Sequence, residues 1–141
     1  MIRAALLACF MASPAIACDE YVFHVGSYHS DREFIPDVNE TNPGLGCRLG
    51  AYEVGVYKNS YSDVTAYAVR DWTHSSGLGV FAGIATGYQD DAAVSDHGVT
   101  VLGGAVYRGD YATIRVAPTY AKDTSAAGAV ISLSFTFGDG Q

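Results

Sequence analysis

The sequence predicts an all-β protein, an eight-stranded antiparallel up-and-down barrel that spans a membrane. Apolar residues recur with a period of two, and no segment of helical length has an apolar stripe with a 3.6-residue period. The opposite face of the alternating segments carries glycine, serine, threonine and alanine, which suit the crowded interior of a narrow barrel. Charged residues make up only 16% of the chain, against about 25% in ordinary soluble domains.

Eight strands are expected, separated by turn-like segments that tend to alternate between short and long. Several of them approach the roughly 9–11 residues that a tilted strand needs to cross a bilayer. The expected ranges are 20–29, 43–49, 51–59, 63–73, 78–89, 98–107, 111–121 and 128–138.

The segment "GAVISLSFTFG" near the C-terminus illustrates the pattern. It places Ile131 and Phe135 on one face and Ser132 and Ser134 on the other. In a membrane barrel the apolar face meets lipid and tyrosines flank it at the interfaces, and closure leaves no strand edge exposed to lipid. A soluble barrel of lipocalin shape is the alternative, although its outer face would normally be charged. Trp72, where a strand is expected to leave the membrane, is interpreted as an interface anchor.

Residues 1–17 are interpreted as a secretory signal peptide, and residues 18–141 as a single barrel domain. Arg3 starts the segment, an apolar run follows, and Ala15-Ile16-Ala17 has the small residues of a cleavage site. A buried N-terminal helix and a lipoprotein site at Cys18 are the alternatives. Cell outer membrane is the predicted location.

Two cysteines of the exported chain, Cys18 and Cys47, enter an oxidising compartment where a disulfide can persist. Two cysteines alone do not define a disulfide framework, and their spacing does not match a zinc site. We favour Cys47 as a small apolar strand residue. Whether the two cysteines pair is left open.

Net charge and motifs exclude several classes of ligand. The chain carries a formal net charge of −7 without a basic stripe, so nucleic-acid binding is not expected. The glycines of "NPGLGCRLG", from Asn42 to Gly50, resemble a dinucleotide loop but lack the helix that must follow one, so we interpret them as strand glycines. The acidic loop "YQDDAAVSDHG" lacks calcium-loop spacing and is interpreted as solvated. No cofactor and no metal are predicted.

Several short motifs together resemble one family. They are Val38-Asn39-Glu40 with Gly44-Leu45-Gly46, Lys58-Asn59-Ser60, Ala117-Pro118-Thr119 and the aromatic segment Ser134-Phe135-Thr136-Phe137. In this order they are similar to the PagP-like lipid A palmitoyltransferases of the outer membrane, phage-borne relatives included. The resemblance implies a monomeric barrel that moves a palmitoyl chain from a phospholipid to lipid A within lipopolysaccharide.

The family's catalytic residues map onto His24, Ser60 and Asn59. Asn59 stands where the family has an aspartate, and an amide cannot supply the charge that stabilises a protonated histidine. Asp63 or Asp31, in neighbouring loops, could take that role. His24 suits a base for acyl transfer near neutral pH, but it can equally be an interior hydrogen-bonding residue.

Two further readings follow from the same residues. Ser60 can be an ordinary turn residue. In that case the alternative function is a non-catalytic barrel that shields the surface or binds a ligand.

Pro118 lies within an expected strand, where it removes a ladder hydrogen bond. The resemblance implies that prolines mark places where strand pairing opens and lipid enters sideways.

Overall fold

The structure, a computed structural model, describes residues 17–31, 37–88, 95–96, 98–121 and 126–138. Nearly all of the predicted signal peptide lies outside these residues, as do Asp90, Asp91 and His97 of the acidic loop. The strands are β1 (Glu20–His29), β2 (Thr41–Leu49), β3 (Tyr52–Lys58), β4 (Val64–Thr73), β5 (Leu78–Thr86), β6 (Ser95–Asp96), β7 (Val99–Arg108), β8 (Ala112–Ala121) and β9 (Ala126–Phe137).

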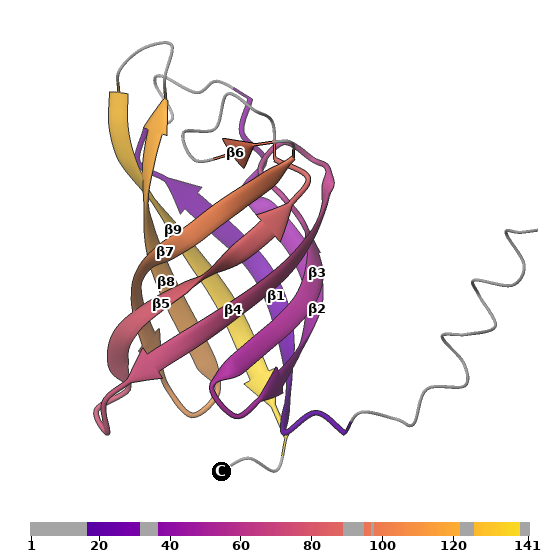
Figure 1. The fold of residues 1–141 in the computed structure, drawn as a ribbon, viewed down its shortest axis with the longest axis vertical. Coiled ribbons are helices and arrows are strands. Elements are labelled where there is room, and N and C mark those ends of the chain that lie inside the picture. Colours follow the sequence, from indigo (N-terminus) through magenta and orange to yellow (C-terminus); the bar gives the residue numbers. More distant parts are fainter. Residues whose placement is uncertain (1–16, 32–36, 89–94, 97, 122–125, 139–141) are drawn as a thin grey trace, which may run out of the picture.

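The described strands form one closed antiparallel barrel. Their order in the sheet is β5-β4-β3-β2-β1-β9-β8-β7-β6, and an additional pairing of β5 with β7 closes the cylinder. The predicted eight strands are therefore confirmed, with β6 as a two-residue addition against the outer end of β7 where a loop was expected. Figure 1 shows the tilted strands wrapping around a common axis.

The two ends of the barrel differ in the length of their connections. At one end the turns are short: residues 50–51 join β2 to β3, residues 74–77 join β4 to β5, and residues 109–111 join β7 to β8. The segment before β1 and the end of β9 lie at this same end, at the bottom of Figure 1. The longer connections lie at the top. In membrane barrels short turns face the periplasm and long loops face outward, which sets the expected orientation.

The distribution of side chains follows the predicted alternation. Small and polar residues such as Thr113, Ser134 and Thr136 are buried inside, because successive side chains of a strand point to opposite faces. Most of the large apolar residues point outward, which suits contact with lipid and not with water. Those exposed include Phe23, Leu45, Val54, Val56, Leu78, Val80, Ile84, Val101, Ile131, Phe135 and Phe137. Among the described residues no helix is long and apolar enough to cross a membrane.

The glycines of the stretch 42–50 act as strand glycines, as the sequence predicted. Gly44 faces the backbone of Tyr57 on β3, and Gly46 faces the hydroxyl of Tyr67 on β4. A side chain at either position would collide with these atoms. The missing side chains therefore let two tyrosines fill the barrel interior.

Cys18 and Cys47 form a disulfide, so the preference for Cys47 as a simple apolar residue was wrong. Tyr21 pairs with Cys47 across β1 and β2, and the backbone N–H of Asp19 donates to the carbonyl of Arg48. This pairing brings the segment before β1 alongside β2, and so brings the two cysteines together. Sequence spacing alone does not reveal such proximity, because it depends on the register between the strands.

Candidate functional site

Ser60 and His29 form a hydrogen-bonded pair at the end of the barrel with the long loops. Ser60 Oγ lies 3.0 Å from Nε2 of His29. His29 is the last residue of β1 and is 95% buried, while Ser60 lies in the turn between β3 and β4. An imidazole at this distance can accept the proton of a serine hydroxyl and so make it nucleophilic.

Glu40 lies on the other side of the His29 imidazole. Its Oε1 accepts a hydrogen bond of 3.0 Å from the backbone N–H of His29 and lies 3.8 Å from Nδ1 of the same residue. When Nε2 accepts the proton of Ser60, Nδ1 must carry a hydrogen. The nearby carboxylate of Glu40 is beyond hydrogen-bond length from Nδ1, so serine, histidine and carboxylate lie close together without the second hydrogen bond of a serine-hydrolase triad.

A β-bulge in β1 turns His29 toward the interior. The register of β1 with both of its neighbours shifts by one residue between His24 and Gly26. Without the shift, positions 24 and 29 would face opposite sides of the wall, since side chains alternate. With it, both histidines face inward, and the extra residue Val25 points outward. The alternation predicted from the sequence assumed an unbroken strand and therefore missed His29.

The turn that carries Ser60 is held by Asn59, whose side chain is fully buried. Its Oδ1 accepts from the backbone N–H groups of Tyr61 and Asp63, at 2.9 and 3.0 Å. Its Nδ2 donates to Thr65 Oγ1 and to the carbonyl of Gly87, at 3.0 and 2.7 Å. Asn59 thus shapes the loop. The described residues show no hydrogen bond between Asn59 and either His24 or His29.

His24, the histidine expected to act with Ser60, lies deeper in the barrel. Its Nε2 is 2.6 Å from the hydroxyl of Tyr67, which donates to Glu53 at 2.9 Å. The described residues show no hydrogen bond between His24 and Ser60. The structure therefore brings Ser60 together with His29, and not with His24.

The two aspartates considered as substitutes lie elsewhere. Asp63 is exposed, and its backbone bonds to Asn59. Asp31 is buried and accepts a hydrogen bond of 2.8 Å from Thr119. In the described part of the chain, neither aspartate shows a hydrogen bond or an ion pair with a histidine. The carboxylate that does lie near His29 Nδ1 belongs to Glu40. In the sequence this residue stood out only as part of the motif Val38-Asn39-Glu40.

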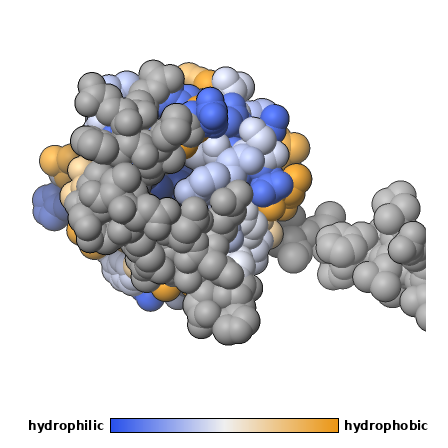
Figure 2. Space-filling model, turned by 90° about the horizontal axis from the view of Figure 1, so that it is seen from above, coloured by the Kyte–Doolittle hydropathy of each residue, from blue (hydrophilic) through white to orange (hydrophobic). Residues whose placement is uncertain are grey.

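A cavity of about 420 Å³ lies below the pair, in the half of the barrel with the long loops. Both His29 and Ser60 line it, and aromatic side chains give it apolar walls, among them Phe81 and Tyr88. The hydroxyl of Tyr88 is 2.7 Å from that of Tyr57, and burial raises the pKa of Tyr88. Seen from above in Figure 2, hydrophilic atoms lie along one side of a recess, and hydrophobic atoms gather at the periphery.

An ion-pair network lies below the cavity. Glu53 accepts hydrogen bonds from Arg48 at 2.7 Å and from Arg115 at 2.9 Å, and Arg115 also bonds Asp71 at 2.9 Å. Arg48 and Arg108 both bond Glu20, at 2.6 and 2.8 Å. Three arginines thus face three carboxylates, so the charges balance inside the wall. The network lies between this cavity and the end of the barrel with the short turns.

Pairing between β7 and β8 is incomplete beside the cavity. These strands are paired only from Ala105 with Val116 to Arg108 with Thr113, although each continues toward the long-loop end. The pairing stops two residues before Pro118, which has no backbone N–H to donate. Farther along β7, the short strand β6 pairs with Val99 and Thr100. Val101, which is exposed on the outer wall and also lines the cavity, borders this seam between the two paired stretches.

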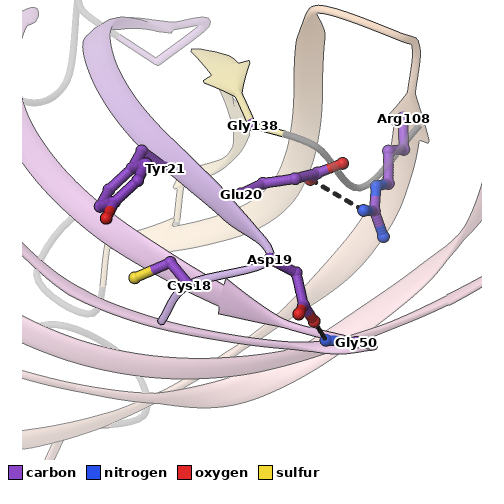
Figure 3. Close-up of a pocket in the computed structure, with 7 residues that line it drawn as sticks. All are labelled: Cys18, Asp19, Glu20, Tyr21, Gly50, Arg108 and Gly138. Atoms are coloured by element: carbon purple, nitrogen blue, oxygen red, sulfur yellow. Dashed lines mark hydrogen bonds and ion pairs between the residues drawn. The ribbon is translucent and has the colours of Figure 1, made fainter. Parts of the chain in front are cut away.

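A second cavity of about 410 Å³ lies at the end with the short turns (Figure 3). Glu20 and Arg108 face each other across it, and Asp19 accepts a hydrogen bond of 2.6 Å from the backbone N–H of Gly50. These groups satisfy one another, and the cavity holds no serine or histidine. Within the described part of the chain no group of three or more His, Cys, Asp or Glu is placed to hold a metal ion.

Two solved structures resemble this fold. A designed transmembrane β-barrel aligns over 86% of this chain and 98% of its own length, with 15% identity and a TM-score of 0.51. The N-terminal β-barrel domain of Pseudomonas aeruginosa OprF aligns over 85% and 98%, with 15% identity and a TM-score of 0.44. No protein-family model matches the chain, and no curated protein matches it. The likeness to the designed barrel shows the fold alone, a barrel of the kind that crosses membranes.

Proposed function

We propose that the protein is an outer-membrane acyltransferase that takes a fatty acyl chain from a glycerophospholipid and passes it to lipid A. Ser60 is the nucleophile, His29 the general base and Glu40 the group that orients His29. The observation that carries this proposal is the 3.0 Å distance between Ser60 Oγ and His29 Nε2 at the rim of a cavity that both residues line. Residues 1–17 serve as the signal for export, and the barrel acts as a monomer.

The reaction has two balanced steps. In the first, Ser60 Oγ attacks the ester carbonyl while His29 Nε2 takes the serine proton and returns it to the departing lysophospholipid oxygen, leaving an acyl-serine. In the second, His29 Nε2 takes the proton of an acceptor hydroxyl, whose oxygen attacks the acyl-serine, and returns that proton to Ser60 Oγ as the bond from Ser60 to the acyl group breaks. The nearby Glu40 carboxylate stabilises the imidazolium that forms in both steps.

The cavity and the seam support a lipid substrate. An acyl chain needs an apolar pocket, and a cavity of about 420 Å³ beneath Ser60 offers one. The incompletely paired seam between β7 and β8 gives a route from the membrane that does not require the chain to cross water. Both features lie in the half of the barrel that faces outward if the short turns face the periplasm.

A non-catalytic barrel of the same fold is the second candidate. The 3.8 Å between Glu40 Oε1 and His29 Nδ1 exceeds hydrogen-bond length and favours it. Active-site hydrogen bonds are, however, often long until substrate binds, so this distance does not exclude catalysis.

The test is the mass of lipid A and of phospholipid from outer membranes that carry the wild type, Ser60→Ala, His29→Gln or His24→Gln. The proposal expects an added acyl mass on lipid A with the wild type, its loss with Ser60→Ala and His29→Gln, and its retention with His24→Gln. The two glutamine variants form a matched pair, since both remove an interior imidazole.

Each other outcome has a separate meaning. Loss of activity with His24→Gln but not with His29→Gln would restore the histidine expected from the sequence. Free fatty acid and lysophospholipid without a change in lipid A would make water the acceptor and the protein a lipase. Unchanged lipids in every membrane, with the folded barrel present, would overturn the proposal in favour of the non-catalytic barrel.

A further inference from the structure

Arg70 is a cation on the outer wall of the barrel, close to the end with the short turns. The burial of β4 alternates, which places Arg70 outside between the outward residues Ala68 and Trp72. It precedes the strand end, Thr73, by three residues. At about 3.3 Å per residue and the usual tilt of barrel strands, it lies roughly 7–8 Å above that end, at the depth of lipid headgroups.

Two aromatic rings hold the Arg70 guanidinium. Its central carbon lies 5.1 Å from the ring centre of Tyr52, directly across on β3, and 5.0 Å from the ring of Trp72. Both rings are themselves on the outer wall, 55% and 46% exposed. Cation–π contacts of this kind fix the direction of the planar guanidinium while leaving its N–H donors available.

Among the described residues, the recorded interactions of Arg70 are those with the two rings, and none is with a carboxylate. The nearest acidic residues along the strands, Glu53 and Asp71, point inward and bond Arg115. Arg70 therefore presents a full positive charge and several donors to the surface that lipid covers.

We propose that Arg70, Tyr52 and Trp72 form a binding site for the phosphate of an anionic glycerophospholipid in the leaflet at the short-turn end. A guanidinium matches phosphate through two parallel hydrogen bonds, and aromatic residues favour the membrane interface at this depth. The whole chain carries a net charge of −7, which repels anionic lipid, so attraction depends on a local cation. This site is independent of the proposed reaction at Ser60.

The experiment uses the fluorescence of Trp72 to report on lipid binding at this site, because Trp72 is the only tryptophan in the sequence. The mature protein is folded into phosphatidylcholine vesicles that contain increasing fractions of brominated phosphatidylglycerol or, in parallel, brominated phosphatidylcholine. Bromine quenches tryptophan fluorescence on contact, so the two curves give the relative affinity of the site for the two lipids. The anionic lipid should bind about fivefold more tightly, which corresponds to about 1 kcal/mol, the contribution of one cation near an anionic surface.

Arg70→Gln keeps the reporter and should reduce the ratio to about one. Lys58→Gln is the matched control, because Lys58 is the other outward-facing cation of the described strands and lies at the opposite end of the barrel. It should leave the fivefold preference intact. Equal affinity of the wild type for the two lipids would overturn the proposal, and so would a preference for the anionic lipid that survives in Arg70→Gln. The first of these results is obtained with the wild type alone and does not depend on the folding of a variant.

Discussion

The hydroxyl of Ser60 and the imidazole of His29 lie 3.0 Å apart although 31 positions separate them in the chain. Two features of the fold bring them together. The bulge at Val25 turns the end of β1 inward, and the backbone N–H of Asn39 donates to the carbonyl of Ser60 at 2.8 Å, joining the loop of Glu40 to the turn of Ser60. Four predictions follow from this arrangement and from the network beneath it.

Deleting Val25 should leave Ser60 reactive while the barrel stays closed. Without the extra residue His24 and His29 are four positions apart, so a regularly alternating β1 still places both of them inside. Labelling of Ser60 by a long-chain fluorophosphonate, measured by mass spectrometry, should therefore stay close to the wild-type level. Val25→Ala, which keeps the bulge, should label equally well. Loss of labelling in a folded deletion variant would show that His29 needs the bulge itself, and not only the inner face of the strand, to reach Ser60.

Asn59→Asp should destabilise the protein and should not raise its activity, although it restores the residue of the resembled family. A carboxylate cannot donate to the carbonyl of Gly87, and it brings a charge into a fully buried position. The expected loss is about 1–3 kcal/mol in the free energy of unfolding by urea. Asp63→Asn, at an exposed neighbouring position, should change it by less than about 0.5 kcal/mol. A more active Asn59→Asp variant would contradict the structural role.

Glu53→Gln should strongly destabilise the barrel, because it removes the carboxylate that Arg48 and Arg115 share. Leaving two buried guanidinium groups without this partner costs about 3–5 kcal/mol. The measurement is the urea concentration at the midpoint of unfolding in lipid vesicles. Unfolding is monitored by the difference in gel mobility between heated and unheated samples. Lys58→Gln again serves as the exposed control. An unchanged midpoint would mean that water or neighbouring groups compensate for the missing charge.

Reducing the disulfide between Cys18 and Cys47 should lower stability without affecting Ser60. The bond closes a loop of 29 positions, which in the chain-entropy description contributes about 3–4 kcal/mol. It lies beside the cavity at the short-turn end, which Cys18 lines, whereas Ser60 lies in the turn between β3 and β4 at the other end. The urea midpoint should therefore fall in reductant or in Cys18→Ser, and fluorophosphonate labelling of the folded protein should not. If reduction lowered both the urea midpoint and the labelling of Ser60 in the folded protein, the disulfide at the short-turn end would influence the site at the other end of the barrel.

Much of the fold could be predicted because a narrow barrel repeats one rule along every strand. Inward positions must be small or paired, and outward positions must be apolar, so Ser134 and Phe135 reveal their faces by alternation alone. The range 20–29 expected for the first strand agrees with β1, Glu20–His29. The last strand begins two residues earlier than expected, at Ala126, because its pairing with β8 continues into the connection.

The candidate site was predicted only in part. Ser60 was chosen from its turn motif, and it does line the cavity. His29 and Glu40 were not chosen, because the first depends on a bulge and the second on a loop that returns to β1. Glu53 and Arg115 are charged residues inside the barrel, and the ion pair between them, which alternation alone does not predict, explains their presence there.

The sequence by itself determined the barrel, its membrane-facing wall and a serine at one rim, because these depend on residue type and on a period of two. Only the tertiary structure decided which histidine meets that serine, that the two cysteines join, and where the pairing of β7 with β8 stops. The physical reason is register. A shift of one residue exchanges the two faces of a strand, and it is set by packing and pairing between strands that lie far apart in the chain.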